Sequence, residues 1–401
     1  MRTEKYLSTK IACYVGYFVQ AIINNLAPLF YVIFHNSLGI SYTKISFLIM
    51  INFLTQLLTD IFSVKVTAKL GYRKSVVIAH IFSAAGLVLL GTLPVMMNGS
   101  YAGLVVPVVI YAMGSGLIEV LISPIIEGLP LSNKSGEMSL LHSFYCWGQM
   151  AVVLVSTICL SIIGGENWKY IPVFWAIIPA VNIFLFLYVP IVPPVPEDEK
   201  EMKISELFRN KTFVILAFLM LCAGASEISM AQWASTFAEK SLGVSKLTGD
   251  LLGPCMFALL MGVGRVVFGV AGDRLDTKKV LTLSGIFCLA SYLLTTLSST
   301  PVLGLVGCSF CGLSVSTMWP GVLSLGAKNF PKGGTGLFAM LAMFGDFGCA
   351  FGPWIAGIMR DFAENSGFTS MEPLKFGLLI CCLFPALIII LLKNLKTKSN
   401  N

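Results

Sequence analysis

Repeated apolar runs of about 20 residues constrain this chain more than any other feature, since a helix of that length spans a bilayer. A water-soluble domain of this size could not bury so much apolar surface, because 56% of the residues are hydrophobic and only 12% are charged. We therefore expect an all-α, multi-pass membrane protein with twelve transmembrane helices. The expected spans are 11–34, 43–64, 75–97, 101–125, 138–163, 170–190, 212–237, 249–271, 279–298, 302–325, 335–359 and 373–393.

The longest connection divides the spans into two sets of six. It reads "IVPPVPEDEKEMKISELFRNK", which is rich in proline and then in charge. We expect an N-terminal six-helix half at 1–190, a cytoplasmic linker at 191–211 and a C-terminal six-helix half at 212–401. The short basic loop "SVKVTAKLGYRKS" has a counterpart in "GDRLDTKK", about 200 residues later. This duplication of a six-helix unit is typical of secondary transporters.

The positions of the basic residues predict the orientation, because cytoplasmic loops of membrane proteins carry an excess of Lys and Arg. With both termini cytoplasmic, all but six of the 27 basic residues fall in cytoplasmic segments or near cytoplasmic helix ends. The six are Lys44, Lys169, Lys240, Lys246, Arg360 and Lys375. We expect a plasma (inner) membrane protein with both termini inside. Its net charge of +7 then reflects topology and does not indicate a nucleic-acid partner.

The cysteine and histidine patterns argue against other classes of protein. All eleven cysteines lie in apolar runs, which is not the pattern of a disulfide framework. The chain has no H-E-x-x-H and no G-x-S-x-G, and its three histidines are scattered. We therefore expect no enzyme, no catalytic residues, no metal site and no cofactor. The coupling ion would be H⁺ or Na⁺.

Four ionisable residues lie well inside apolar runs, where each is costly and a functional candidate. They are Glu119, His142, Glu227 and Asp346. The fourth helix runs inward and the fifth outward, so Glu119 and His142 can approach each other. A carboxylate beside an imidazole in a wet cavity can exchange a proton near neutral pH. The alternative is a purely structural Glu–His hydrogen bond.

Amides and tryptophans in the spans could hold a sugar. An aromatic ring packs against the apolar face of a sugar while polar groups bind its hydroxyls, although tryptophans also serve in core packing. The predicted substrate-binding residues are Asn24, Asn25, Glu119, His142, Glu227, Gln232, Trp233 and Trp319. The predicted ion-coupling residues are Glu119, Glu227 and Asp346, and Asp346 could equally be a satisfied structural carboxylate.

The segment Gly269-Val-Ala-Gly-Asp273-Arg274, followed by Lys278 and Lys279, resembles the loop signature of the major facilitator superfamily. In the first half, Arg73 and Lys74 match only the end of that signature. The resemblance implies the major facilitator fold. Paired charges in this loop could latch the inner side of a transporter in one conformation, or they could only fix topology. The predicted latch comprises Arg73, Lys74, Arg265, Gly269, Asp273 and Arg274.

Three short segments are similar to the fucose–proton symporter family within that superfamily. They are "NNLAPL" in the first helix, "GLIEVLISP" in the fourth and "LHSF" in the fifth. The resemblance implies that Glu119 is a substrate or proton site and that His142 neighbours the substrate. The family's first-helix aspartate falls on Pro28 here. Coupling would then pass to Glu119, Glu227 or Asp346.

The sequence thus predicts a secondary active transporter that works by alternating access in the lipid bilayer. Its solute would be small and polar, most plausibly a sugar, moved by a proton or sodium gradient, and the transporter would be a monomer. A proton-coupled efflux antiporter for amphipathic drugs or metabolites is an alternative, because such a cavity also holds aromatics and carboxylates. A non-transporting membrane sensor is a further alternative.

Overall fold

The computed structural model describes residues 6–130, 134–192, 202, 204–271, 276–330 and 333–395. Within these residues the secondary structure is helical and includes no β-strand. Twelve helices in the described part of the chain are long and apolar enough to cross a membrane, which confirms the predicted fold class. They are Leu7–Leu38, Tyr42–Ser63, Lys69–Met96, Tyr101–Ser123, Leu140–Ile163, Tyr170–Tyr188, Lys211–Ser241, Lys246–Phe268, Thr277–Leu297, Pro301–Gly326, Met340–Ser366 and Pro373–Asn394.

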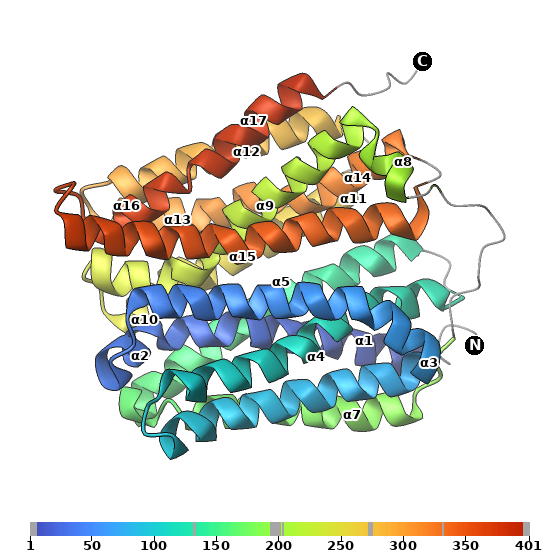
Figure 1. Ribbon diagram of the computed structural model, residues 1–401, viewed down its shortest axis with the longest axis horizontal. Helices are drawn as coiled ribbons and strands as arrows, with labels where there is room; N and C mark the ends of the chain where they lie inside the picture. Colours follow the sequence, from blue (N-terminus) through green and yellow to red (C-terminus); the bar gives the residue numbers. More distant parts are fainter. Residues whose placement is uncertain are drawn as a thin grey trace. The chain divides into compact units, whose positions relative to one another are not determined.

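The chain divides into two compact units, and the first comprises Met1–Pro196 together with Lys246–Leu251. Its helices are α1 (Leu7–Leu26), η2 (Ala27–Phe30), α2 (Tyr31–Leu38), α3 (Tyr42–Met96), α4 (Tyr101–Gly128), α5 (Lys134–Ile163), η3 (Gly165–Asn167), α6 (Tyr170–Trp175), α7 (Ile177–Tyr188) and α10 (Lys246–Asp250). The long α3 holds two spans and is kinked at Gly71, near the start of the second span, where a φ of 78° and a ψ of 161° are not helical. Within this unit α3 packs along α4, and α1 packs against α5, α4 and α7 (Figure 1).

The second unit comprises Glu197–Ser245 and Leu252–Asn401. Its helices are α8 (Ile204–Phe208), α9 (Lys211–Thr236), η4 (Phe237–Ser241), η5 (Leu251–Cys255), α11 (Met256–Ala271), α12 (Thr277–Leu297), α13 (Pro301–Val315), α14 (Met318–Asn329), α15 (Gly334–Ser366), α16 (Pro373–Ile380) and α17 (Leu383–Asn394). Here α9, in green, lies along α15, in orange, and α12 packs on α13 (Figure 1).

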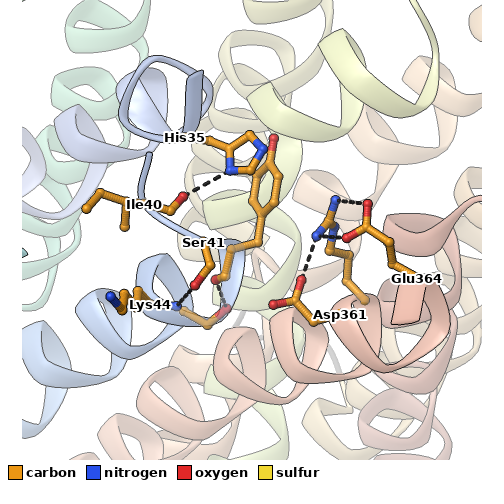
Figure 2. A network of polar contacts seen from close by, with 9 residues as sticks. His35, Ile40, Ser41, Lys44, Asp361 and Glu364 are labelled. Carbon is orange, nitrogen blue, oxygen red and sulfur yellow. Dashed lines mark hydrogen bonds and ion pairs between the residues drawn. The ribbon is translucent and has the colours of Figure 1, made fainter. Parts of the chain in front are cut away.

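Local sequence signals place the helix ends in both units. Ser41 caps α3, and its Oγ accepts a hydrogen bond from the Lys44 amide at 3.3 Å (Figure 2). The turn before it is closed by His35, whose Nδ1 lies 3.0 Å from the Ile40 carbonyl oxygen (Figure 2). In the second unit, the last turns of α15 carry an ion pair of Arg360 with Asp361 and Glu364, two acidic residues also seen in Figure 2.

Glycines let neighbouring helices approach closely, as is common in membranes. A Cβ placed on Gly348 of α15 would lie 1.9 Å from the Leu221 carbonyl oxygen of α9, so these two backbones are in direct contact. In the first unit, a Cβ on Gly114 of α4 would lie 2.6 Å from the Ala79 carbonyl oxygen of α3. These contacts fix the positions of the polar side chains that the same helices carry.

Candidate functional site

Two polar contacts join α1 to α4 inside the first unit. The Tyr17 and Ser123 hydroxyl oxygens lie 2.8 Å apart. One turn along, Gln20 Nε2 donates a hydrogen bond to Glu119 Oε2 at 2.7 Å. The pairing is regular because residues three or four apart share one face of a helix. It places Glu119 on the face of α4 that packs against α1.

The polar contacts between α1 and α4 continue for another helical turn, where they also involve residues of α3. Gln56 Nε2 donates to Asn24 Oδ1 at 2.9 Å, and Ser115 Oγ donates to Gln56 Oε1 at 2.8 Å. Asn52 Nδ2 also donates to Asn24 Oδ1, at 3.2 Å. We call the full set the α1–α4 ladder: Tyr17, Gln20, Asn24, Ser115, Glu119 and Ser123, with Asn52 and Gln56 of α3.

Glu119 differs from the rest of the ladder in charge and in exposure. It lies within the span Tyr101–Ser123 and is partly exposed, whereas Asn24, Gln56 and Ser115 are buried. Its hydrogen-bond donor Gln20 is a neutral amide, so this contact orients the carboxyl group without compensating a charge. A carboxylate has two oxygens and several acceptor positions, so Glu119 can bind another donor while Gln20 holds Oε2.

The two adjacent asparagines of α1 point to different helices. Asn24 contacts α3, whereas Asn25 Nδ2 donates to the Ala21 carbonyl at 3.0 Å and to the Tyr145 hydroxyl of α5 at 3.3 Å. Both asparagines are buried. The 3-10 turn η2, with Pro28, begins two residues after Asn25. In this conformation both amides therefore contact neighbouring helices, whereas the sequence predicted them as substrate-binding residues.

His142 of α5 is exposed, and its ring packs edge-on against Tyr17 with the centroids 5.0 Å apart. Tyr17 and Gln20 lie on the same face of α1. Glu119 and His142 thus contact neighbouring turns of one helix, through Gln20 and Tyr17 respectively. Two ionisable side chains within the first unit's spans therefore lie close to the same stretch of α1.

In the second unit, Glu227 of α9 pairs with Arg265 of α11. Arg265 Nη2 lies 3.2 Å from Glu227 Oε1 and 3.3 Å from Oε2, and both residues belong to membrane spans. Glu227 is buried, with 8% of its surface exposed. A buried charge is strongly destabilising once its partner is removed, so each residue requires the other. Arg265, predicted as a latch residue, contacts the predicted substrate residue Glu227.

Gln232 and Trp233 lie on the buried length of α9. Gln232 is 3% exposed and Trp233 is fully buried. The Trp233 indole Nε1 donates to the Pro353 carbonyl oxygen of α15 at 2.9 Å. In this conformation the Trp233 ring therefore packs between helices, which was the alternative to a sugar-binding role.

Trp319 of α14 has a different environment. It is partly exposed, and a Cβ on Gly345 of α15 would lie 2.3 Å from Trp319 Cη2. The indole therefore rests directly against the backbone at Gly345, which fixes the plane of the ring. Asp346 follows Gly345 and is 5% exposed. Such a supported, partly exposed ring is suited to stacking on an apolar ligand face.

The predicted latch residues of the first half contact the end of a helix in their own unit. Arg73 Nη1 donates to the carbonyl oxygens of Phe186 and Leu187, and Nη2 donates to that of Val189, at 2.7–2.8 Å. The cation thereby binds the free carbonyl groups at the C-terminus of α7, where the helix dipole is negative. Lys74, the next residue, is exposed.

The second half repeats this contact with a different residue. Lys278 Nζ, at the start of α12, donates to the carbonyl oxygen of Leu395, just after the C-terminus of α17, at 2.7 Å. Gly269 lies near the end of α11. Asp273 and Arg274 lie outside the described residues. In each half, a basic residue of the duplicated loop thus holds the end of that half's last helix.

Sequence reasoning missed most of the ladder. Tyr17, Gln56, Ser115 and Ser123 are ordinary hydroxyl and amide residues, which carry no signal when they are taken singly. The spacing would have revealed them: polar residues recur at three- or four-residue intervals in α1 at 17, 20 and 24 and in α4 at 115, 119 and 123. A polar stripe of this kind within an apolar span faces another helix and not lipid.

Comparison with known proteins agrees with the predicted fold. The family model described as Major Facilitator Superfamily matches residues 13–353. No curated protein matches the chain in sequence. A solved variant of the fucose:proton symporter of E. coli is 18% identical, with a TM-score of 0.65 over 98% of this chain and 100% of that one. A D-xylose-proton symporter is 15% identical, with a TM-score of 0.73 over 95% and 97%.

A solved variant of the nucleoside transporter NupG is 14% identical, with a TM-score of 0.75 over 96% of this chain and 99% of that one. At such low identities these likenesses establish the fold alone. The family model, which spans most of the sequence, is independent of them and confirms the superfamily predicted from the loop signature. This multi-pass membrane protein is a member of the Major Facilitator Superfamily.

Proposed function

We propose that the protein is a proton-coupled symporter that carries a small polar solute, a sugar, across the plasma membrane by alternating access. Both termini would be cytoplasmic, and the protein would work as a monomer. Glu119 would be the proton-carrying group. The observation that carries the proposal is the Gln20–Glu119 contact: a partly exposed carboxyl group within a membrane span, held by an uncharged amide at 2.7 Å.

The choice of proton over sodium follows from that environment. A carboxyl group held by an amide can gain or lose a proton without leaving a partner charge exposed in the membrane. Glu227 is less suited to the role, because neutralising it would leave Arg265 as an uncompensated buried cation. Two of the solved relatives are described as proton symporters of sugars, which supports the same choice.

A sugar fits the groups that remain available. In the first unit, Glu119 and His142 offer acceptors and donors for hydroxyl groups, and the side chain that holds Glu119 is the neutral amide of Gln20. In the second unit, considered by itself, Trp319 offers a supported ring for an apolar ligand face, and Arg265 is paired with Glu227. Since Arg265 is already paired, a neutral solute suits these groups better than an anion.

The proposal is tested by reconstituting the full chain in liposomes and measuring uptake of labelled fucose, xylose, glucose and uridine. Wild type should accumulate at least one sugar when the outside is acidic and should not respond to a sodium gradient. Glu119→Gln should abolish accumulation while retaining counterflow, in which labelled and unlabelled sugar exchange without net proton movement. Glu166→Gln, which removes an exposed carboxylate outside the spans, is the control and should behave as wild type.

Two outcomes would overturn the proposal. Normal proton-driven accumulation by Glu119→Gln would remove this residue from coupling. Export of a cationic dye in exchange for protons, without uptake of any of the sugars, would favour the efflux antiporter instead.

A further inference from the structure

The Tyr17–Ser123 hydroxyl pair lies one helical turn from Glu119, and proton coupling by Glu119 alone does not require it. Its oxygens are 2.8 Å apart and either can donate to the other. Tyr17 is buried at 4% exposure, and Ser123 is partly exposed. Hydroxyl groups in a membrane span need partners, and the Ser123 hydroxyl could have bonded to a carbonyl of its own helix, as Ser46 and Ser83 do, but it contacts Tyr17 instead.

The pair has the chemistry of a proton relay. A hydroxyl group donates one hydrogen bond and accepts others, so it can pass its own proton onward as it receives another. Ser123 follows Glu119 by four residues on α4, which places their Cβ atoms about 5–6 Å apart on one face of the helix. One water molecule spans the remaining gap between a serine hydroxyl and a carboxyl group at that separation.

We propose that the Tyr17–Ser123 pair conducts protons between Glu119 and the cytoplasmic side of the membrane. The proposal rests on the function proposed above, in which Glu119 carries the proton and the termini are cytoplasmic. Since α1 begins at Leu7, Tyr17 lies nearer the cytoplasm than Gln20, and Ser123 lies nearer the cytoplasm than Glu119 on the inward-running α4. The pair therefore occupies the path by which Glu119 would discharge inward.

The step balances as a proton transfer alone. Glu119 gives its proton to the bridging water, which passes one to Ser123 Oγ. Ser123 gives its own hydroxyl proton to Tyr17 Oη, and Tyr17 releases its own to water on the cytoplasmic side. Glu119 ends as a carboxylate and both hydroxyls are restored. The exposed His142 ring packs edge-on against Tyr17 at this end of the path.

Other titratable groups face this region from the neighbouring helices. Asp60 of α3 approaches α4 at Gly116, where a Cβ would lie 2.8 Å from Asp60 Oδ1. His80 of α3 lies on the other side of α1, 3.7 Å from a Cβ on Gly16. Tyr145 of α5 contacts Asn25, which lies beyond Gln20 in the outward direction. Among these contacts, the Tyr17–Ser123 pair is the one that joins α1 to α4 on the inward side of Glu119.

The test uses Tyr17→Phe and Ser123→Ala in the reconstituted full chain. Phenylalanine keeps the ring against His142 and removes only the hydroxyl group. Proton entry is followed with a pH dye trapped in the liposomes, and counterflow is measured with whichever of fucose, xylose and glucose the wild type accumulates. Tyr292→Phe and Ser46→Ala are matched controls, since both residues are buried hydroxyls outside the ladder, Tyr292 in the second unit and Ser46 near the start of α3.

Each relay variant should slow proton-driven uptake by on the order of tenfold or more, because a positioned proton-transfer group contributes at least that much. Counterflow should stay within twofold of wild type, and the slowed step should become more sensitive to replacing H₂O with D₂O.

Unchanged proton entry in both variants overturns the proposal. An equal loss of counterflow and uptake also overturns it, because such a loss indicates a structural role. If Glu119→Gln abolishes coupling and both relay variants couple normally, the relay fails and the proposed function stands. If Glu119→Gln couples normally, the proposed function fails.

Discussion

The Glu227–Arg265 pair provides a sharp test of how charge is balanced in the second unit. Replacing Arg265 with Gln leaves the Glu227 carboxylate buried without its cation, and breaking a buried pair in this way typically costs about 3–5 kcal/mol. The side chains are 16% and 10% exposed, so solvent screens the remaining charge little. A single nitrogen, Nη2, reaches both carboxylate oxygens at 3.2 and 3.3 Å, which is weaker than a two-nitrogen fork and favours the lower end of that range.

The double substitution Glu227→Gln with Arg265→Gln removes both charges together. Because both glutamines are uncharged, no unpaired charge remains buried in the double variant. The double variant should therefore be more stable than Arg265→Gln alone. A loss of about 3–5 kcal/mol corresponds to a drop in Tm of roughly 6–20 °C for a unit of this size. The double variant should recover at least half of that drop.

The chain supplies its own reporter for the measurement. Thermal unfolding in detergent can be followed with a dye that becomes fluorescent on reacting with thiols, because Cys222, Cys308, Cys311 and Cys381 of the second unit are all buried until it unfolds. Lys240→Gln, which removes an exposed charge in η4, should leave Tm unchanged. If the Tm losses of the two single variants simply add in the double variant, the two charges are not coupled and the electrostatic account of this pair is wrong.

Two further substitutions test the contacts that hold each half together. Arg73→Ala should lower the stability of the first unit by about 1–3 kcal/mol, since three carbonyl oxygens at the end of α7 lose a charged donor, whereas Lys74→Ala should have no effect in the same thiol assay. Gly348→Ala should cost about 1–3 kcal/mol, because the added Cβ would clash with the Leu221 carbonyl oxygen and push α15 away from α9. Gly165→Ala should have no effect, because its added Cβ would lie 3.8 Å from the nearest side chain, Ile33. A Tm equal to wild type in Arg73→Ala or Gly348→Ala would show that the helices adjust without cost.

The helices could be predicted from the sequence because the bilayer leaves few options. A segment in hydrocarbon must satisfy its backbone internally, so an apolar run of sufficient length has to be a helix. Caps refine the boundaries: Ser100 and Thr300 accept hydrogen bonds from Gly103 and Leu303 at the starts of α4 and α13, the fourth helices of the two halves. The break at Gly71 was harder to place, because a glycine in a basic loop can take either a helical or a positive φ.

The candidate site could be predicted only in part. Glu119 and His142 were identified because ionisable residues in spans are rare, but their neighbours Gln20 and Tyr17 were not. Which polar residues meet depends on the rotation of each helix about its axis, and that rotation is set by packing against neighbouring helices. Tryptophans illustrate the same limit. Trp233 and Trp319 both lie in membrane spans, yet one is fully buried and bonded to Pro353, and the other is partly exposed against Gly345.

The two halves share an architecture but differ in how they hold their membrane carboxylates, and this difference bears on coupling. Each half anchors the end of its last helix with a basic loop residue, Arg73 in one and Lys278 in the other. Glu119, however, faces an amide, whereas Glu227 faces an arginine. A carboxylate held by a fixed cation gains little by taking up a proton, because the cation would be left unpaired in the membrane. A duplicated transporter with this asymmetry would therefore carry its proton in the first half and keep a permanent charge pair in the second. Glu227→Gln combined with Arg265→Gln should accordingly retain proton-driven uptake that Glu119→Gln alone abolishes.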